Sequence, residues 1–301
     1  MYDVIIIGSG FAGMTAGIYA ARAGLSHVIV EKEPFPGGQI IKTAEVDNYP
    51  GFEKISGTDL ALKVRSHCQS LSVKFTEGEV VEVKKNSDNL FSVIMKNNSV
   101  LECKNIIIAV GAKPRLMNVP GEIEYTGRGV SYCATCDGPL YRKKNVVVFG
   151  GGDSALRTAL YLADLAENVL LVHRRQQFRA DKTLVDEAEK RINITIIRDA
   201  VPESIVGDEL VSGVNITDVN TKEKKHFACD GVFVAIGSDP DTGVFGSVVE
   251  LDKTGYIIAG ENCKTNVEGI YAAGDCRTGM IKQLVTAAAD GAVAVSMIKG
   301  H

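Results

Sequence analysis

Two stretches of the chain repeat one order of apolar and polar positions. Each begins with a continuous apolar run, passes a glycine-rich turn, continues as an amphipathic segment and ends in a second apolar run. They occupy residues 4–31 and 146–173, and the predicted helices end near Gly24 and Ala166. Continuous apolar strands beside such helices are typical of parallel sheets covered on both faces. The pattern predicts an α/β chain with two Rossmann-like, doubly wound domains.

Short alternating segments follow the first repeat and predict antiparallel strands at residues 78–83, 91–95 and 100–102. They lead into an apolar run at residues 105–111. A similar run at residues 230–237 follows another set of short strands after the second repeat. The two halves are therefore imperfect copies of one nucleotide-domain plan.

A polar segment that contains proline ends each copy, at residues 112–115 and 238–241, and we expect both to be linkers. The tail that follows has a predicted short strand near residues 256–258 and a predicted helix from about residue 282 to 299. It is too short to form a domain, so we expect it to return and complete the first one. The second domain is then inserted into the first, with segments at residues 1–114, 115–240 and 241–301.

Composition and charge narrow the class of protein. The 301 residues suit two domains, and 45% hydrophobic with 23% charged residues is typical of a globular chain. A net charge of -4 offers no basic surface to nucleic acid or to an anionic membrane. Apolar runs fall far short of the roughly 20 residues of a membrane span, and a strand pattern starts at Tyr2 without a targeting leader. We expect a cytoplasmic protein with no membrane or nucleic-acid partner.

The first glycine turn has the spacing of a dinucleotide site. Gly8, Gly10 and Gly13 stand where the chain must reverse, approach a pyrophosphate and pack helix on strand. The helix that follows offers free N–H groups and the positive end of its dipole to phosphates. Glu31 closes the second strand, where a carboxylate would bond a ribose hydroxyl pair. We interpret this segment as a nucleotide site rather than a plain glycine turn.

The second glycine turn differs at the ribose position. It carries Gly150, Gly152 and Ala155, but basic residues replace the carboxylate that ends the strand. Guanidinium groups form charge-assisted, bidentate bonds with a ribose 2′-phosphate, whereas a carboxylate would repel it. The sequence therefore favours NADPH over NADH in the second site and FAD in the first. The alternative for the basic residues is that they form the solvated start of a helix and bind no ligand. The basic residues are His173, Arg174, Arg175 and Arg179.

A pair of cysteines, Cys133 and Cys136, precedes the second turn. Seven cysteines is an odd number, so we expect a redox-active or metal-binding pair rather than a disulfide framework. We interpret the pair as a disulfide tuned for exchange. The alternatives are a pair of inert core cysteines and a zinc site, although zinc needs four ligands and the sequence has no second such pair. Asp137 follows, and we favour a proton donor to a leaving thiolate over a solvated turn residue.

The other cysteines occur singly, and we expect each to be a small buried hydrophobic residue. Cys276, beside Asp275, is the one closest to an expected flavin contact. The set is Cys68, Cys103, Cys229, Cys263 and Cys276.

Several long motifs run through the chain: GSGFAG near the start, GGQ at residues 37–39, CATCDG, GGGDSA, HRRQQFRA, GIYAAGDC and KQLVTAAADG. With them the chain resembles the low-molecular-weight thioredoxin reductases over its full length. The resemblance implies the pyridine nucleotide-disulfide oxidoreductase architecture, FAD and NADPH as cofactors, and a cytoplasmic homodimer that reduces thioredoxin or a similar small disulfide protein. Lys282 departs from the pattern, because many relatives have arginine there and the planar fork is lost.

The resemblance also implies which residues contact the cofactors. Expected flavin contacts, in addition to those of the first turn, are Phe11, Ala12, Lys32, Gly37, Gly38, Gln39, Asn48, Val81, Ala109, Gly111, Gly274, Asp275, Lys282 and Gln283. Expected NADPH contacts, in addition to those of the second turn, are Asp153, Ser154, Ile236 and Gly237.

The resemblance gives the two thiols different roles. Cys136 faces the flavin and Cys133 attacks the thioredoxin disulfide, while the inserted domain rotates about its linkers between the two tasks. Alternatives are a reductase of another protein disulfide (a glutaredoxin-like protein or a peroxidase component), a ferredoxin-fed reductase, and an oxidase that makes disulfides in a small molecule. The arginines after residue 173 argue against the last two, because neither needs an NADPH site. A nucleotide-sensing binding protein would not need the cysteine pair.

Overall fold

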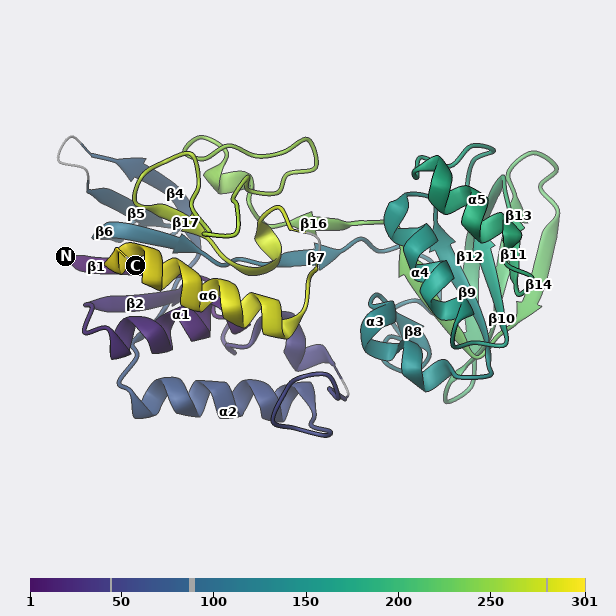
Figure 1. The fold of residues 1–301 in the computed structure, drawn as a ribbon, viewed down its shortest axis with the longest axis horizontal. Coiled ribbons are helices and arrows are strands. Elements are labelled where there is room, and N and C mark those ends of the chain that lie inside the picture. The colour runs from purple at the N-terminus through teal and green to yellow at the C-terminus, as the bar shows by residue number, and fades with distance from the viewer. Residues whose placement is uncertain (44, 87–89, 280, 301) are drawn as a thin grey trace. The chain divides into compact units, whose positions relative to one another are not determined.

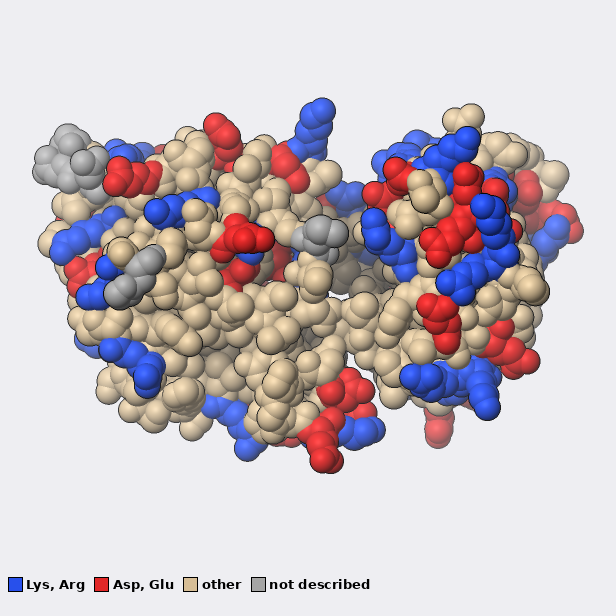
Figure 2. All heavy atoms as spheres, in the orientation of Figure 1, with Lys and Arg blue, Asp and Glu red and all other residues tan. Residues whose placement is uncertain are grey.

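The computed structural model describes the chain apart from residues 44, 87–89, 280 and 301 (Figure 1). The chain divides into two compact units, which are described one at a time. Among the described residues, no helix has both the length and the apolar character needed to cross a membrane. On the face drawn in Figure 2, basic and acidic side chains are interspersed, in agreement with the small net charge.

Unit 1 comprises Met1–Lys113 and Asp239–His301 and is built on a seven-stranded sheet in the order β3-β2-β1-β6-β5-β4, with β17 also paired to β6. β1 lies parallel to β2 and β6, while β4, β5 and β6 are joined in antiparallel fashion. The strands are β1 (Tyr2–Ile7), β2 (His27–Glu31), β3 (Phe75–Glu77), β4 (Val80–Lys85), β5 (Phe91–Met95), β6 (Val100–Ile108) and β17 (Ile270–Ala272).

Alternation along β1 sends Val4 and Ile6 to one face of this sheet and Ile5 and Ile7 to the other, so both faces are apolar and covered. The first face packs against α1, α2 and α6 (Figure 1). The second face packs against residues 245–276. The helices are α1 (Phe11–Arg22), α2 (Gly57–Ser70) and α6 (Leu284–Lys299), with short 3-10 helices η1 (Gly38–Lys42), η3 (Gly243–Phe245) and η4 (Gly274–Cys276).

Unit 2, Pro114–Ser238, has a five-stranded parallel sheet in the order β11-β10-β9-β15-β8. Helices α4 and α5 pack on one face, and the antiparallel sheet β12-β13-β14 packs on the other. The strands are β8 (Val130–Ser131), β9 (Asn145–Gly150), β10 (Asn168–Val172), β11 (Ile194–Ile197), β12 (Ala200–Gly207), β13 (Val211–Asp218), β14 (Lys224–Ala228) and β15 (Gly231–Ala235). The helices are α3 (Ala134–Asp137), η2 (Gly138–Tyr141), α4 (Asp153–Ala163) and α5 (Lys182–Lys190).

The chain crosses between the units twice. The crossing segments, expected to be plain linkers, pair with each other as β7 (Ala112–Pro114) and β16 (Ser238–Pro240). The unit boundaries fall after Lys113 and after Ser238, one and two residues before the expected ones. The prediction of an α/β fold with two Rossmann-like units is confirmed, and the predicted antiparallel strands β4 and β5 belong to the main sheet of unit 1, which is therefore mixed.

Two local predictions are wrong. The strand expected near residues 256–258 is absent: Ile257 makes only isolated bridges, because the Asp252 carboxylate accepts bonds from the Thr254 and Tyr256 amides and forms a turn. The segments expected as two strands at residues 100–102 and 105–111 are one strand, β6. Polar residues interrupt the apolar pattern in the first part of β6, where most side chains are exposed or half-buried.

Candidate functional site

The three glycines of the first turn serve different purposes. Gly8 has a φ of +102°, and a Cβ there would lie 2.4 Å from the Ala109 carbonyl oxygen. A Cβ on Gly13 would lie 1.9 Å from the Gly8 carbonyl oxygen. A Cβ on Gly10 would meet nothing within 4 Å, and α1 starts there with no side-chain cap and no acidic residue in its first turn. The chain itself requires Gly8 and Gly13, whereas the space at Gly10 and the uncapped N–H groups suit a phosphate.

Glu31 is fixed beside this turn. Its carboxylate accepts bonds from the Ser9 amide at 2.7 Å, the Ser9 hydroxyl at 2.6 Å and the Glu33 amide at 2.9 Å. Lys32, the next residue, forms an ion pair with Asp241. An oriented carboxylate at the end of the second strand is what a ribose diol needs as an acceptor.

The loop at residues 37–39 lies against the same turn. The Gly37 amide donates to the Ser9 carbonyl at 3.0 Å, and a Cβ on Gly38 would lie 3.2 Å from the Gly10 Cα. The Gln39 side-chain amide donates to the backbone of β7. Two segments that are distant in sequence therefore meet at the N-terminus of α1.

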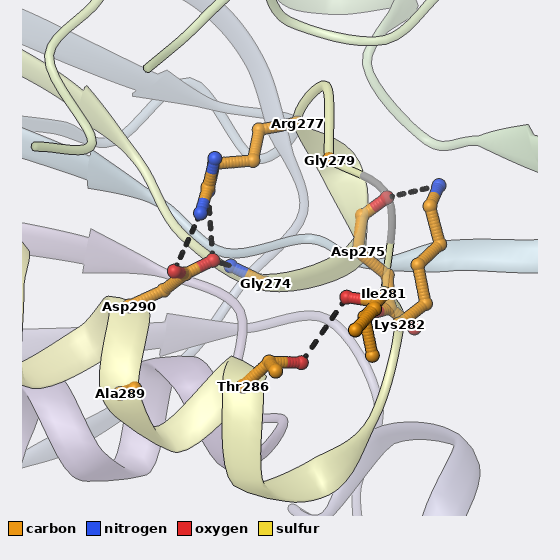
Figure 3. Close-up of a pocket in the computed structure, with 9 residues that line it drawn as sticks. All are labelled: Gly274, Asp275, Arg277, Gly279, Ile281, Lys282, Thr286, Ala289 and Asp290. Carbon is orange, nitrogen blue, oxygen red and sulfur yellow. Dashed lines mark hydrogen bonds and ion pairs between the residues drawn. The ribbon is translucent and has the colours of Figure 1, made fainter. Parts of the chain in front are cut away.

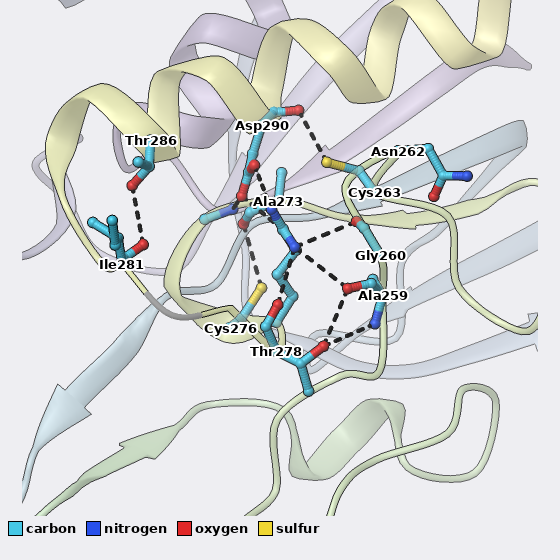
Figure 4. Close-up of polar contacts among 12 residues, drawn as sticks. Ala259, Gly260, Asn262, Cys263, Ala273, Cys276, Thr278, Ile281, Thr286 and Asp290 are labelled. Carbon is cyan, nitrogen blue, oxygen red and sulfur yellow. Dashed lines mark hydrogen bonds and ion pairs between the residues drawn. The ribbon is translucent and has the colours of Figure 1, made fainter. Parts of the chain in front are cut away.

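The segment after β17 forms a third part of the site (Figures 3 and 4). Arg277 makes two bonds to the Asp290 carboxylate, at 2.7 and 2.6 Å, and this ion pair is only 15% and 13% exposed. Asp290 also accepts the Gly274 amide at 2.9 Å. The pair fixes the segment to α6, and a cavity of about 290 Å³ lies between them. The cavity is lined by Gly274, Asp275, Arg277, Gly279, Ile281, Lys282, Thr286, Ala289 and Asp290.

Asp275 lies at this cavity, and burial raises the pKa of its carboxyl above the ordinary value. Lys282 donates to the Asp275 backbone carbonyl at 3.0 Å, and its ammonium lies 3.3 Å from the centroid of the Tyr256 ring. The Asn48 side-chain amide donates to Gln283 at 3.2 Å. The expected contacts Asp275, Lys282 and Gln283 thus lie close together. Tyr256 was not among the residues predicted from the sequence, and the structure adds it to this part of the site.

The remaining expected flavin residues divide by exposure. The side chains of Phe11, Ala12 and Ala109 are buried at 4–6% exposure, so only their backbone can face a ligand. Gly111 has a φ of +67° at the end of the strand-to-linker turn. Val81 is 42% exposed on β4, and its place in the site stays a prediction.

Cys133 and Cys136 are joined in a disulfide, with their Cα atoms 5.3 Å apart. Cys133 is the N-cap residue of α3, and both cysteines are half-buried. The buried Ser131 hydroxyl donates to the Asp137 carboxylate at 2.5 Å and accepts the Cys133 amide at 3.1 Å. Ser131 therefore links Asp137 to the cysteine pair. This serine, two residues ahead of Cys133, was not among the residues predicted from the sequence.

The five single cysteines are all buried, which confirms the prediction. Burial raises the pKa of the Cys276 thiol to about 11, and its sulfur donates to the carbonyls of Ile108 and Ala273. Burial likewise raises the pKa of Cys229, which lies in unit 2, to about 12. These thiols stay protonated at neutral pH and are inert. Within the described residues, no cluster of three or more His, Cys, Asp or Glu residues could hold a metal ion.

The second turn in unit 2 repeats the geometry of the first. Gly150 has a φ of +156°, and a Cβ there would lie 2.4 Å from the Ala235 carbonyl oxygen and 2.6 Å from the Ala155 Cβ. A Cβ on Gly152 would meet nothing within 4 Å. α4 begins at Asp153, whose side chain binds the Asp181 amide at 2.8 Å. The expected contact residues Ser154, Ile236 and Gly237 lie in the first turn of α4 and directly after β15.

The basic residues of the second site are not equivalent. Arg174, Arg175 and Arg179 are exposed, so their guanidinium groups are accessible to a ligand. His173 is only 5% exposed, and burial lowers its pKa below the ordinary value. The prediction that His173 belongs with the arginines as a direct phosphate contact does not fit its burial.

Comparison with known proteins agrees with this geometry. The family model described as pyridine nucleotide-disulphide oxidoreductase matches residues 2–291. The chain belongs to this family. It is 42% identical to a 34.2 kDa protein in the rubredoxin operon of Clostridium pasteurianum (99% of this chain, 96% of the relative). It is 41% identical to a thioredoxin reductase of Listeria monocytogenes (98% and 92%). Its structure is similar to the crystal structure of a thioredoxin reductase from Streptococcus pyogenes, with a TM-score of 0.94 and 42% sequence identity (100% of this chain, 97% of that chain).

The cofactors of this oxidoreductase are FAD and NADPH. The residues present fit both groups. Each unit has an open glycine position at an uncapped helix N-terminus, where a pyrophosphate can approach, and the units differ at the ribose position, Glu31 in one and exposed arginines in the other. The fold class expected from the sequence, with one nucleotide-binding domain inserted in another, is the architecture of this family.

Proposed function

We propose that the chain is a thioredoxin reductase, which passes electrons from NADPH to the disulfide of thioredoxin through Cys133 and Cys136. The observation that carries this proposal is the Cys133–Cys136 disulfide, which lies in unit 2 directly ahead of the turn that leads to the exposed arginines. Relatives named thioredoxin reductase align with nearly the whole chain and support the proposal.

Each unit would bind one nucleotide. In unit 1 the site for FAD would comprise the turn at Gly10, the Glu31 carboxylate, the loop at residues 37–39 and the side chains of Asp275, Lys282 and Gln283. In unit 2 the turn at Gly152 and the arginines would hold NADPH. FAD, when bound, supplies a two-electron carrier between the nicotinamide and the disulfide.

The chain's own thiols perform the exchange. The Cys133 thiolate of the reduced pair attacks one sulfur of the thioredoxin disulfide, so an S–S bond forms between the proteins and the other partner sulfur leaves as a thiolate. The Cys136 thiolate then attacks the Cys133 sulfur, which restores the Cys133–Cys136 disulfide and releases the second partner thiolate. Both released thiolates take a proton. The partner gains two electrons and two protons, and NADPH supplies the electrons that reduce the pair again.

Asp137→Asn is expected to lower the turnover of thioredoxin by roughly tenfold to a hundredfold, because the carboxyl held by Ser131 would no longer supply a proton to a leaving thiolate. The turnover rate is measured against pH. The decline in rate that deprotonation of an acid causes as pH rises should disappear in the variant. Asp208→Asn, at an exposed position of the same unit, is the matched control. An unchanged rate and pH profile in Asp137→Asn would contradict the proton role.

Unit 2 has two tasks, since its disulfide must accept electrons at the flavin and deliver them to a protein. We infer that it turns about the paired strands β7 and β16 between these tasks. We also infer a homodimer in the cytoplasm, as the likeness to the thioredoxin reductases implies.

Anaerobic titration tests the proposed function. The flavin-loaded protein is titrated with NADPH and separately with NADH, and flavin absorbance and free thiols are recorded. NADPH should bleach the flavin and release two thiols per chain from the Cys133–Cys136 disulfide, and thioredoxin should then reoxidise them. If a glutaredoxin-like protein or a peroxidase component reoxidises the thiols and thioredoxin does not, the partner is different. If neither nucleotide bleaches the flavin, the proposed electron source is wrong.

A further inference from the structure

His173 is the centre of a small stack beneath the arginine-bearing loop at residues 174–179. Its ring stacks on Phe178, with centroids 4.8 Å apart and planes at 16°, and its Nε2 lies 3.1 Å from the Gln177 carbonyl oxygen. The Arg198 guanidinium lies 5.2 Å from the centre of the Phe178 ring and pairs with Glu189 at 2.5 Å. The loop that presents the arginines is therefore packed on a ring that is itself buried.

The same ring determines the middle glycine of the second turn. Gly151 does not have a left-handed φ, yet a Cβ there would lie 2.0 Å from both the Cε1 and the Nδ1 of His173. Gly151 also accepts the Arg179 amide at 2.9 Å, and the Asp153 carboxylate accepts the Asp181 amide at 2.8 Å. Three contacts thus join the glycine turn to the two ends of the arginine-bearing loop. Since the backbone conformation at Gly151 is an ordinary one, the imidazole is the reason for the glycine.

We propose that His173 is a positioning residue for nucleotide specificity: through Gly151 and Phe178 it fixes the arginine-bearing loop relative to the glycine turn, so that the subsites for the 2′-phosphate and the pyrophosphate keep one spacing. It does so without touching the nucleotide. This inference rests on the proposed function, because it assumes that unit 2 binds NADPH. Burial lowers the pKa of His173, so the ring is neutral at physiological pH and adds no charge of its own to the phosphate site.

A positioning role has a specific consequence. The bonds from Arg174 and Arg175 to a 2′-phosphate depend on the position of the loop, whereas the pyrophosphate bonds come from the turn itself and from α4. Loosening the loop should therefore weaken the binding of a nucleotide with a 2′-phosphate and spare one without it. A histidine that only stabilised unit 2 would affect both nucleotides equally.

The test measures binding of NADP⁺ and NAD⁺, which differ only in the 2′-phosphate, to the full flavin-loaded chain by isothermal titration calorimetry. His173→Ala should weaken NADP⁺ binding by about tenfold and change NAD⁺ binding by less than about twofold, since tenfold corresponds to part of one charge-assisted bond. Gly151→Ala should have the same effect by displacing the ring. In a His173→Ala background, Gly151→Ala should add little, because the atoms it would meet are gone.

These variants are compared with one positive and one negative control. Arg174→Ala removes a proposed direct contact and should weaken NADP⁺ binding alone, while His226→Ala, in the antiparallel sheet of the same unit, should change neither affinity. Equal losses for both nucleotides in His173→Ala and Gly151→Ala, additive losses in the double variant, or unchanged affinities would overturn the inference. If His173→Ala does not fold, Gly151→Ala decides the question alone. A wild-type protein that binds NAD⁺ as tightly as NADP⁺ would instead refute the NADPH assignment on which the inference rests.

Discussion

The Cys136→Ser protein is expected to lose turnover with thioredoxin by at least about a thousandfold and yet to capture its partner covalently. Without the Cys136 thiol, the mixed disulfide formed by Cys133 cannot be resolved within the chain. The complex should therefore accumulate and run as a larger species on a non-reducing gel, and dithiothreitol should reduce the mixed disulfide and separate the two proteins. Turnover is measured as the oxidation of NADPH that depends on added thioredoxin.

The reciprocal variant tests which of the two thiols attacks the partner. Cys133→Ser should lose turnover to the same extent and capture nothing, because the attacking sulfur is missing. Cys229→Ala, which removes a buried thiol of the same unit, should keep turnover and capture nothing. Capture by Cys133→Ser instead of Cys136→Ser would exchange the roles of the two thiols. Capture by neither would count against thioredoxin as the partner.

Features that depend on neighbouring residues were predictable from the sequence. The two glycine turns, the apolar strands that flank them and the Cys133–Cys136 pair all lie in short segments whose spacing has a direct physical meaning. Their chemistry follows from residue type alone, since a carboxylate or a guanidinium at the end of the second strand selects a ribose diol or a 2′-phosphate. The fold class followed because the same plan occurs twice.

Contacts between distant segments were not predictable from pattern. Asn48 bonds to Gln283 across 235 residues, and the Lys282 ammonium lies over the Tyr256 ring, and neither pair leaves a periodic signal. The burial of His173 was missed for a related reason. It precedes two arginines in the sequence, so it was grouped with them, whereas its ring turns inward because Gly151 leaves room for it.

The spacing of the first turn predicts a different task for each glycine, and the structure supplies the distances. A Cβ at Gly8 or Gly13 would collide with the chain, whereas a Cβ at Gly10 meets nothing within 4 Å. The two kinds of glycine should therefore respond differently to the same added methyl group.

Gly10→Ala is expected to leave the unfolding temperature of the flavin-free protein unchanged and to weaken FAD binding by roughly tenfold or more, because the new methyl group meets no atom of the chain and occupies the side that a pyrophosphate approaches. Gly13→Ala is expected to lower the stability of the flavin-free protein itself by about 1–3 kcal/mol, because its methyl group would lie 1.9 Å from the Gly8 carbonyl oxygen. Thermal unfolding of the flavin-free chain and fluorescence titration with FAD measure the two effects separately.

Gly243→Ala is the matched control, since a Cβ there meets nothing within 4 Å, its φ is not in the left-handed region and it lies in unit 1 away from the turn. It should change neither stability nor FAD affinity. If Gly10→Ala binds FAD as well as the control does, the open space at the start of α1 is not where the pyrophosphate lies, and the assignment of FAD to this turn fails. If Gly10→Ala instead destabilises the flavin-free chain as Gly13→Ala does, the glycine serves the fold, and the weaker binding would no longer indicate a ligand at that position.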